Sequence, residues 1–181
     1  MGCCDAHPEP VTGVDAGAGD RPACSTLVVG CGNLLRGDDA LGPVLVRRLL
    51  DRGLPPGVEV ADAGTSGMDV AFRMRGRPRV ILVDAARTGG EPGTLYRLTG
   101  DDVATLPPLE GINLHAFRWD HALAFGRWAL KDEYPDEVVV FLVEAASLEF
   151  GAPLSAPVEA AMDRLVELLL AGELAVPEAT R

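Results

Sequence analysis

Residues 27–42 read LVVGCGNLLRGDDALG, and this segment joins a buried strand to a helix through a glycine turn. Apolar and β-branched residues predict the strand over 26–31, and two glycines mark the turn that follows it. The next loop carries two adjacent carboxylates, Asp38 and Asp39, to the start of a helix with one apolar face. Paired acids between a strand and a helix indicate a functional site.

The two glycines invite comparison with a dinucleotide-binding loop, in which backbone amides and a helix N-terminus hold a pyrophosphate. The spacing fits that motif poorly, because Leu35 stands where a third glycine is expected and Gly37 is out of step. Two carboxylates also occupy the place where a phosphate needs positive surroundings. Paired acids suit a cation better, although Asp39 by itself could simply cap the helix and interact with its dipole.

The composition indicates one domain and restricts its partners. A chain of 181 residues can bury one full core and is short for two. Its net charge of −11, from 16 basic and 27 acidic residues, argues against nucleic acid or an anionic membrane surface as a partner. No apolar run reaches the length of about 18 residues that a membrane span needs. Four cysteines without a C-x-x-C pair favour a reducing compartment, so we expect a cytoplasmic protein.

The chain divides into an extension, one folded domain and a tail. Residues 1–25 are small and polar with almost nothing to bury, so they are predicted to be disordered. The domain is predicted to cover 26–172, and 173–181 to form a loose tail. Strand-like and helix-like segments alternate along the domain. This alternation predicts a single-domain α/β fold, a three-layer α/β/α sandwich around a twisted, mostly parallel five-stranded sheet.

The strands of this sheet can be placed from apolar runs and turn signals. They are expected over 26–31, 58–61, 80–83, 94–98 and 138–143. The run at 80–83 is the most apolar and is predicted to be central. The turn signal EPG at 91–93 leaves too short a connection for a crossover helix, so the strand at 94–98 is predicted to be an antiparallel edge.

The helices between these strands have recognisable starts. Ser66 stands three residues before Asp69, and this S-x-x-D spacing indicates a helix cap and not a nucleophile, since no G-x-S-x-G elbow is present. A later helix is predicted to begin at Asn113, and the last one near Ser155. The faces expected to be buried contain Met68, Ala71 and Phe72 in the helix after Ser66, and Phe117, Ala124, Phe125 and Trp128 in the helix after Asn113.

Acidic residues follow the predicted strands at the points where these end. The acids are Asp38 and Asp39 after the first strand, Asp62 after the second, Asp84 after the third and Glu144 after the last. Ligands of open α/β sheets bind outside the carboxyl ends of the strands, so these side chains are expected to meet at one edge. His115, in the first turn of its predicted helix, can join them.

Asp39, Asp62 and His115 form the predicted metal site. Two carboxylates and an imidazole suit Ni²⁺, Zn²⁺, Fe²⁺ or Co²⁺ and leave positions open for water or a substrate. The alternatives stay open that Asp62 is a turn residue and that His115 is an exposed residue at a helix start. His121 lies four residues from two phenylalanines and is predicted to pack in the core. Cys31 is predicted to be a small buried thiol.

Four segments also resemble one family. VVGCGNLLRGDDALGP is similar to the signature G-x-G-N-x-L-x-x-D-(D/E)-x-x-G, and DAGTSGMDV to a D-x-G-T-x-G block. NLHAF is similar to a segment with Ser or Thr two residues before a histidine, and VEAASLEFGAPLS to a last-strand segment in which proline usually follows the acid. In these segments the chain resembles the hydrogenase maturation endopeptidases, which process the large subunits of NiFe hydrogenases. The similarity covers about residues 26–171.

The resemblance implies an endopeptidase that removes the C-terminal peptide of a hydrogenase large-subunit precursor after nickel insertion, with the substrate-borne nickel as the recognition mark. Carried over position by position, the metal-binding residues of the family fall on Asp39, Asp62 and His115. Asp38 is then a candidate general base, or a residue that orients the ligands. The isolated protein could hold another divalent metal at the same place.

Two other classes of protein remain open on the sequence. A free-standing metallohydrolase that uses the same acids is expected to bind metal tightly alone and to cleave small substrates. A non-catalytic, nickel-dependent hydrogenase chaperone is expected to bind the precursor without shortening it.

Overall fold

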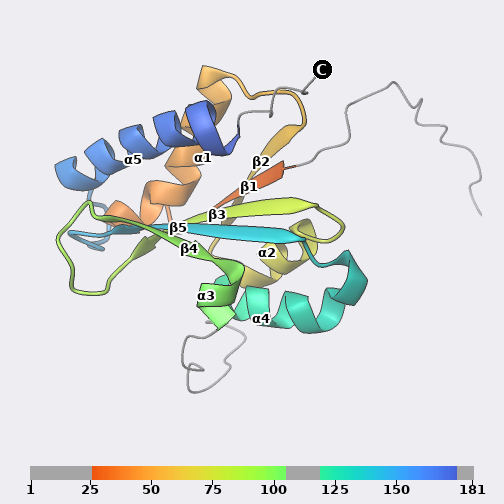
Figure 1. The fold of residues 1–181 in the computed structure, drawn as a ribbon. Coiled ribbons are helices and arrows are strands. Elements are labelled where there is room, and N and C mark those ends of the chain that lie inside the picture. Colours follow the sequence, from red (N-terminus) through yellow and green to blue (C-terminus); the bar gives the residue numbers. More distant parts are fainter. Residues whose placement is uncertain (1–25, 105–118, 175–181) are drawn as a thin grey trace, which may run out of the picture.

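A computed structural model describes residues 26–104 and 119–174, which form a five-stranded sheet between two layers of helices (Figure 1). The strands are β1 (Thr26–Cys31), β2 (Val58–Gly64), β3 (Arg79–Ala86), β4 (Leu95–Thr99) and β5 (Glu137–Glu144). Their order across the sheet is β2-β1-β3-β5-β4. All neighbours are parallel except β4, which pairs antiparallel with β5 at one edge. The predicted fold, the central third strand and the antiparallel edge are confirmed.

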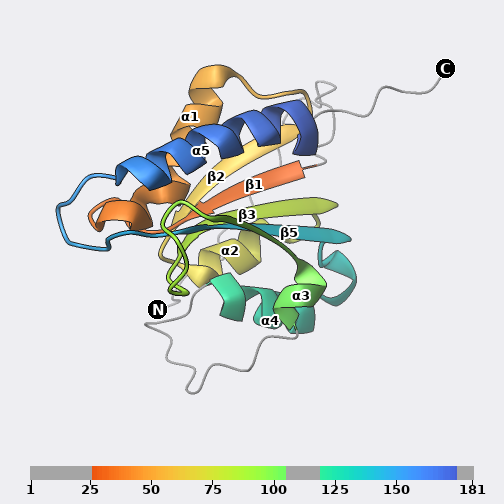
Figure 2. The ribbon, with the colours of Figure 1, turned by 60° about the vertical axis from the view of Figure 1, so that its left-hand side comes forward.

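Helices cover both faces of the sheet, as Figure 2 shows. On one face lie α1 (Leu41–Arg52) and α5 (Ala156–Leu168). On the other lie α2 (Gly67–Arg73) and α4 (Trp119–Leu130), with the short α3 (Gly100–Ala104) beside them. Three short turns complete the described chain: η1 (Gly37–Ala40), η3 (Lys131–Glu133) and the π-helical η4 (Leu169–Glu173). No helix in these described ranges has the length and apolarity to span a membrane.

Alternate residues of the central strands point into two separate cores. In β3, Val80 and Leu82 pack with α2 and α4, whereas Ile81 and Val83 pack with α1 and α5. Each of these four side chains is fully buried, which is typical of a parallel strand covered on both faces. This alternation assigns every later residue of β3 to one face or the other.

The glycines after β1 serve close packing. A Cβ atom on Gly30 would lie 2.2 Å from the carbonyl oxygen of Gly42, and one on Gly42 would lie 2.1 Å from that of Cys31. A Cβ atom on Gly32 would meet the carbonyl oxygen of Asp39 at 1.8 Å. The backbone of η1 and α1 therefore fills the space that a pyrophosphate would need, and this geometry argues against the dinucleotide interpretation.

Two predicted helix faces differ from those observed. Ser66 caps α2 as predicted, because its Oγ accepts a hydrogen bond of 3.2 Å from the amide of Asp69. Phe72, however, is 64% exposed and Trp128 is 75% exposed. The buried residues of α4 are Trp119, Ala122, Leu123 and Gly126. Small residues let α4 approach its neighbours closely, since a Cβ atom on Gly126 would meet the sulfur of Met74 at 3.4 Å.

The folded domain extends slightly beyond its predicted end. Glu173 forms ion pairs with Arg79 and Arg97, and Leu174 is 3% exposed, so these two residues belong to the domain and not to the tail. The helix of the last segment begins after Ser155 as predicted. The extension at 1–25, the predicted helix start at Asn113 and the remainder of the tail lie outside the described residues.

Candidate functional site

A pocket of about 460 Å³ opens at the carboxyl ends of the strands, on the side of the sheet that α2 and α4 cover. Its walls come from the turn after β1, the loop before α2, the end of β3 and the start of α4. The charged residues that line it are three acids, Asp39, Asp84 and Asp120, and two arginines, Arg36 and Arg87. The pocket therefore lies at the edge of the sheet where the sequence predicts a site.

Asp39 offers a carboxylate without a partner. Its backbone is held in η1, since its amide donates to the carbonyl of Arg36 (3.1 Å) and its carbonyl accepts from the amide of Asn33 (3.0 Å). The side chain is partly buried and lines the pocket. Within 26–104 and 119–174, no residue donates a hydrogen bond to this carboxylate or forms an ion pair with it. It is therefore available to bind a cation.

Asp84 brings a second carboxylate to the same pocket. It stands two residues after Leu82 in β3, so strand alternation directs it toward the side of α2 and α4. It is 7% exposed, and its Oδ1 accepts a hydrogen bond of 2.8 Å from the amide of Ala85. Gly32 lies beside both acids, because a Cβ atom there would be 3.6 Å from Oδ1 of Asp84 and would clash with the backbone of Asp39.

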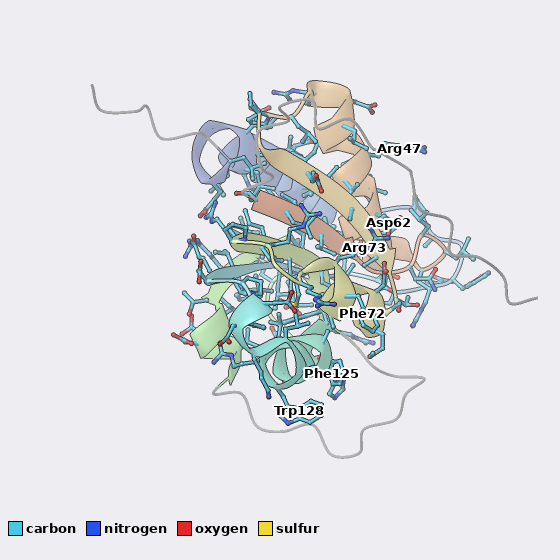
Figure 3. All side chains as sticks on the ribbon, turned by 90° about the vertical axis from the view of Figure 1, so that its right-hand side faces the viewer. Arg47, Asp62, Phe72, Arg73, Phe125 and Trp128 are labelled. Carbon is cyan, nitrogen blue, oxygen red and sulfur yellow. The ribbon has the colours of Figure 1, made fainter. Side chains whose placement is uncertain are left out.

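Asp62 is not part of this pocket, which corrects the predicted pairing of Asp39 with Asp62. Ala61 and Ala63, its neighbours in β2, pack in the core under α2 and α4, so Asp62 lies on the opposite face of this edge strand (Figure 3). Its side chain is exposed, and its Oδ1 accepts a hydrogen bond of 2.8 Å from the amide of Gly64. The structure therefore agrees with the alternative that Asp62 is a turn residue.

Asp38, the candidate general base, is saturated by hydrogen bonds. It is fully buried, and its Oδ2 accepts from the amides of Ala146 (2.8 Å) and Ser147 (2.9 Å) and from Oγ of Ser155 (3.0 Å). Its Oδ1 accepts from the amide of Ser155 at 2.6 Å. A carboxylate with four donors is poorly placed to take a proton from a substrate. Asp38 instead fastens the loop after β5 to η1.

Glu144 braces a second loop in the same manner. It is 1% exposed and accepts hydrogen bonds from the amide (2.8 Å) and hydroxyl (2.7 Å) of Thr88 and from the amides of Gly89 (2.8 Å) and Gly90 (3.2 Å). Burial opposes ionisation of Glu144, but these donors outweigh it and lower the pKa of the carboxyl below its usual value. Glu144 therefore stays charged and shapes the loop after β3.

The histidines do not complete a metal site in the described part of the chain. His115 lies outside it. His121 is partly buried, and its Nδ1 is 3.8 Å from the carboxylate of Asp120. Across 26–104 and 119–174, no three His, Cys, Asp or Glu side chains are grouped to hold a metal ion. Asp39 and Asp84 can supply two ligands, and any third must come from outside these residues or from a bound substrate.

Sequence reasoning counted Asp84 among the acids at the edge but did not select it. The signal that distinguishes it from Asp62 is the two-residue period of a strand, counted from residues of known facing. The position of Arg36 and Arg87 at the pocket was not predicted. Nothing in their local sequence distinguishes them from arginines that form ion pairs.

Known proteins resemble this chain both in sequence and in structure. A sequence model of the hydrogenase maturation protease family matches residues 43–172. A protein of Methanocaldococcus jannaschii is 35% identical over 155 residues, which are 82% of this chain and 95% of that protein. The hydrogenase 2 maturation protease of Escherichia coli is 33% identical over 147 residues, 80% of this chain and 88% of the relative. The solved structure of the hydrogenase maturating endopeptidase of E. coli has a TM-score of 0.65 at 31% identity, and the match covers 81% of this chain and 90% of that one.

Proposed function

Because the chain belongs to the hydrogenase maturation protease family, and is thus a peptidase, we propose that it removes the C-terminal peptide of a NiFe-hydrogenase large-subunit precursor once nickel has been inserted. The observation that carries this proposal is the unpartnered carboxylate of Asp39 beside Asp84, in a pocket at the carboxyl edge of the sheet. Two acids facing an open pocket suit a divalent cation that arrives with the substrate. We propose the cytoplasm as the place of this reaction.

Nickel enters this reaction as part of the substrate. Two carboxylates are too few ligands to hold Ni²⁺ tightly, whereas an ion already bound by the precursor would bring its other ligands with it. Asp39 and Asp84 are the residues that we assign to this ion. His115 stays the predicted third ligand. The bound ion would supply Lewis-acid chemistry near the scissile carbonyl.

The other residues of the site hold its walls in place. Asp38 fastens the loop after β5, and Glu144 fastens the loop after β3. Both loops border the pocket, so the buried acids fix the shape of the surface that a peptide would contact. Asp39 is then free to interact with the substrate while its backbone is held by η1.

A mass measurement of the large-subunit precursor tests this function. The precursor is incubated with and without the protein, in nickel-loaded and nickel-free form. We expect the mass of one C-terminal peptide to be lost only when both the protein and nickel are present. Cleavage of the nickel-free precursor at the same rate would contradict nickel recognition, and binding without any loss of mass would identify a chaperone.

Metal binding by the isolated protein distinguishes the proposed function from that of a free-standing metallohydrolase. We expect Ni²⁺ and Zn²⁺ to bind weakly to the protein without its precursor, because no three His, Cys, Asp or Glu side chains of the described residues are grouped to hold an ion. Isothermal titration calorimetry measures this directly. Tight binding together with hydrolysis of small peptides would favour a free-standing metallohydrolase.

A further inference from the structure

Arg36 and Arg87 lie at the mouth of the acidic pocket, on loops that are far apart in the sequence. Both line this pocket, and both also line a smaller one of about 260 Å³ beside it. The wall of the smaller pocket is formed by residues 145–149, part of the loop that Asp38 fastens. Both arginines therefore border the same two pockets, one of which also contains the acids.

These arginines have no acidic partner in the described chain. Salt bridges there are formed by Arg48, Arg52, Arg73, Arg75, Arg77, Arg79, Arg97 and Arg127. Arg164 donates to the carbonyl of Gly93. Over 26–104 and 119–174, only Arg36, Arg47 and Arg87 lack a side-chain hydrogen bond or ion pair. Glu149 also lines the smaller pocket, yet it pairs with neither arginine.

The backbones of both arginines are held. The amide of Arg36 donates to the carbonyl of Asn33 at 3.0 Å, and its own carbonyl accepts from Asp39. Arg87 stands between Ala86, whose carbonyl accepts from the amide of Ala145 at 2.8 Å, and the loop that Glu144 braces. The two side chains thus start from fixed positions, which lowers the entropy cost of using them together.

The positive charge of Arg36 and Arg87 indicates which chemical group they can bind. A protein of net charge −11, with three acids lining its pocket, is on the whole unfavourable for the approach of a negatively charged group. We propose that Arg36 and Arg87 bind a carboxylate of the peptide that is cut from the precursor. Guanidinium groups match the geometry of a carboxylate and form strong charge-assisted hydrogen bonds with it. The acids then take the cation and the arginines the carboxylate, so the peptide is held in one direction.

Exposed apolar residues beside the arginines fit a protein substrate. Leu34 and Leu35 are 60% and 58% exposed, and Phe150 is 75% exposed. The amide of Gly151 donates to the carbonyl of Leu35 at 2.8 Å, so the two loops that carry these side chains are joined. An apolar surface next to a charged anchor is typical of a site that receives a peptide chain.

This inference rests on the proposed function, and its test compares three variants of equal charge. Arg36→Gln and Arg87→Gln remove the two guanidinium groups, and Arg47→Gln removes an unpaired arginine that lines neither pocket. With nickel-loaded precursor, we expect KM to rise about tenfold in each of the first two variants while kcat changes little, as loss of one charge-assisted hydrogen bond predicts. Arg47→Gln should change KM less than about twofold.

The carboxylate has two possible sources, the side chain of an acidic residue or the free C-terminus of the peptide. Synthetic peptides of the cleaved segment separate them, one with a C-terminal amide and one with its acidic side chains replaced by amides. One of these two peptides lacks the carboxylate that the arginines bind. That peptide should bind equally to the wild-type protein and to the double variant of Arg36 and Arg87. Fluorescence anisotropy measures the affinities.

The failure of this inference can be distinguished from that of the proposed function. If the precursor is shortened and Arg36→Gln and Arg87→Gln match Arg47→Gln in KM, the arginine site is wrong and the function stands. If no precursor is shortened by the wild-type protein, the function is wrong, and the unmodified peptide still decides the inference. Binding about tenfold weaker in the double variant supports it, and equal binding overturns it.

Discussion

The carboxylates at this site have different roles because their hydrogen-bond partners differ. Asp38 and Glu144 are buried, and each accepts four hydrogen bonds from loop residues. Asp39 follows Asp38 directly, yet its carboxylate faces the pocket without such donors in the described chain. The donors to Asp38 come from residues more than a hundred positions away. The sequence could therefore predict the acids at the edge. It could not predict which of their carboxylates accept hydrogen bonds from distant loops.

The charge of Glu144 predicts a pH-dependent stability. Its pKa is lowered in the fold, so the charged form stabilises the protein above its ordinary pKa of 4.5, and this contribution is lost as pH falls through the lower value of the folded state. We expect Glu144→Gln to reduce the free energy of unfolding by about 2 kcal/mol at pH 7, since a buried charged acceptor is lost. The difference from wild type should shrink below about pH 4.5, where the unfolded carboxyl takes up a proton.

Urea unfolding at several pH values measures this effect. Glu149→Gln is the matched control, because Glu149 is exposed and has no ion pair within the described chain. It should unfold like the wild type throughout. A difference between Glu144→Gln and wild type that grew toward low pH would contradict the assigned direction of the pKa.

At the scale of elements, strand alternation decides which acid enters the pocket. Asp84 in β3 and Asp62 in β2 both lie near the carboxyl end of a strand, but they point to opposite faces. The strand β3 is covered on both sides and its residues 80–83 are all apolar, so its sequence shows no alternation from which the facing of Asp84 can be assigned. The strands themselves could be predicted, whereas the facing of their acids required the packed structure. In α4, Phe125 packs against the core as expected but Trp128 is exposed, because the buried face runs through Trp119, Ala122, Leu123 and Gly126.

The contact between α1 and β1 predicts that Gly42 cannot be replaced by alanine. A Cβ atom there would lie 2.1 Å from the carbonyl oxygen of Cys31, so α1 would have to move off the sheet. We expect Gly42→Ala to lower the free energy of unfolding by about 2 to 3 kcal/mol, as overpacking does. Gly172→Ala is the control, because nothing lies within 4 Å of its added Cβ atom. Equal stability of the two variants in urea would contradict this account of the glycine turn.

The cap of α2 gives a second test at this scale. Ser66 accepts a hydrogen bond from the amide of Asp69, and removal of such a cap costs about 1 kcal/mol. Ser66→Ala should therefore be less stable to urea by about this amount and should still shorten the precursor. A variant of unchanged stability that no longer cleaves would show that Ser66 is a nucleophile and not a cap.

At the scale of the whole molecule, the charges are separated around one edge of the sheet. In a chain of net charge −11, one pocket is lined by three acids and by two arginines that have no ion pair among the described residues. The composition gives the net charge but not the position of these two arginines, because this depends on which arginines form ion pairs in the folded chain. We expect added salt to raise the KM for the precursor in the wild type, and to do so less in the double variant of Arg36 and Arg87. Steady-state rates between about 0.05 and about 0.3 M NaCl measure this.

Processing of nickel-loaded precursor by three asparagine variants tests the central claim, that Asp39 and Asp84 together receive the metal. Each variant keeps the size of the side chain and an oxygen acceptor, so Asp62→Asn retains its bond to the amide of Gly64. We predict that Asp39→Asn and Asp84→Asn slow the loss of the C-terminal peptide by about 100-fold or more, and that Asp62→Asn stays within a few-fold of wild type. Loss of processing in Asp62→Asn, with Asp84→Asn active, would contradict this account.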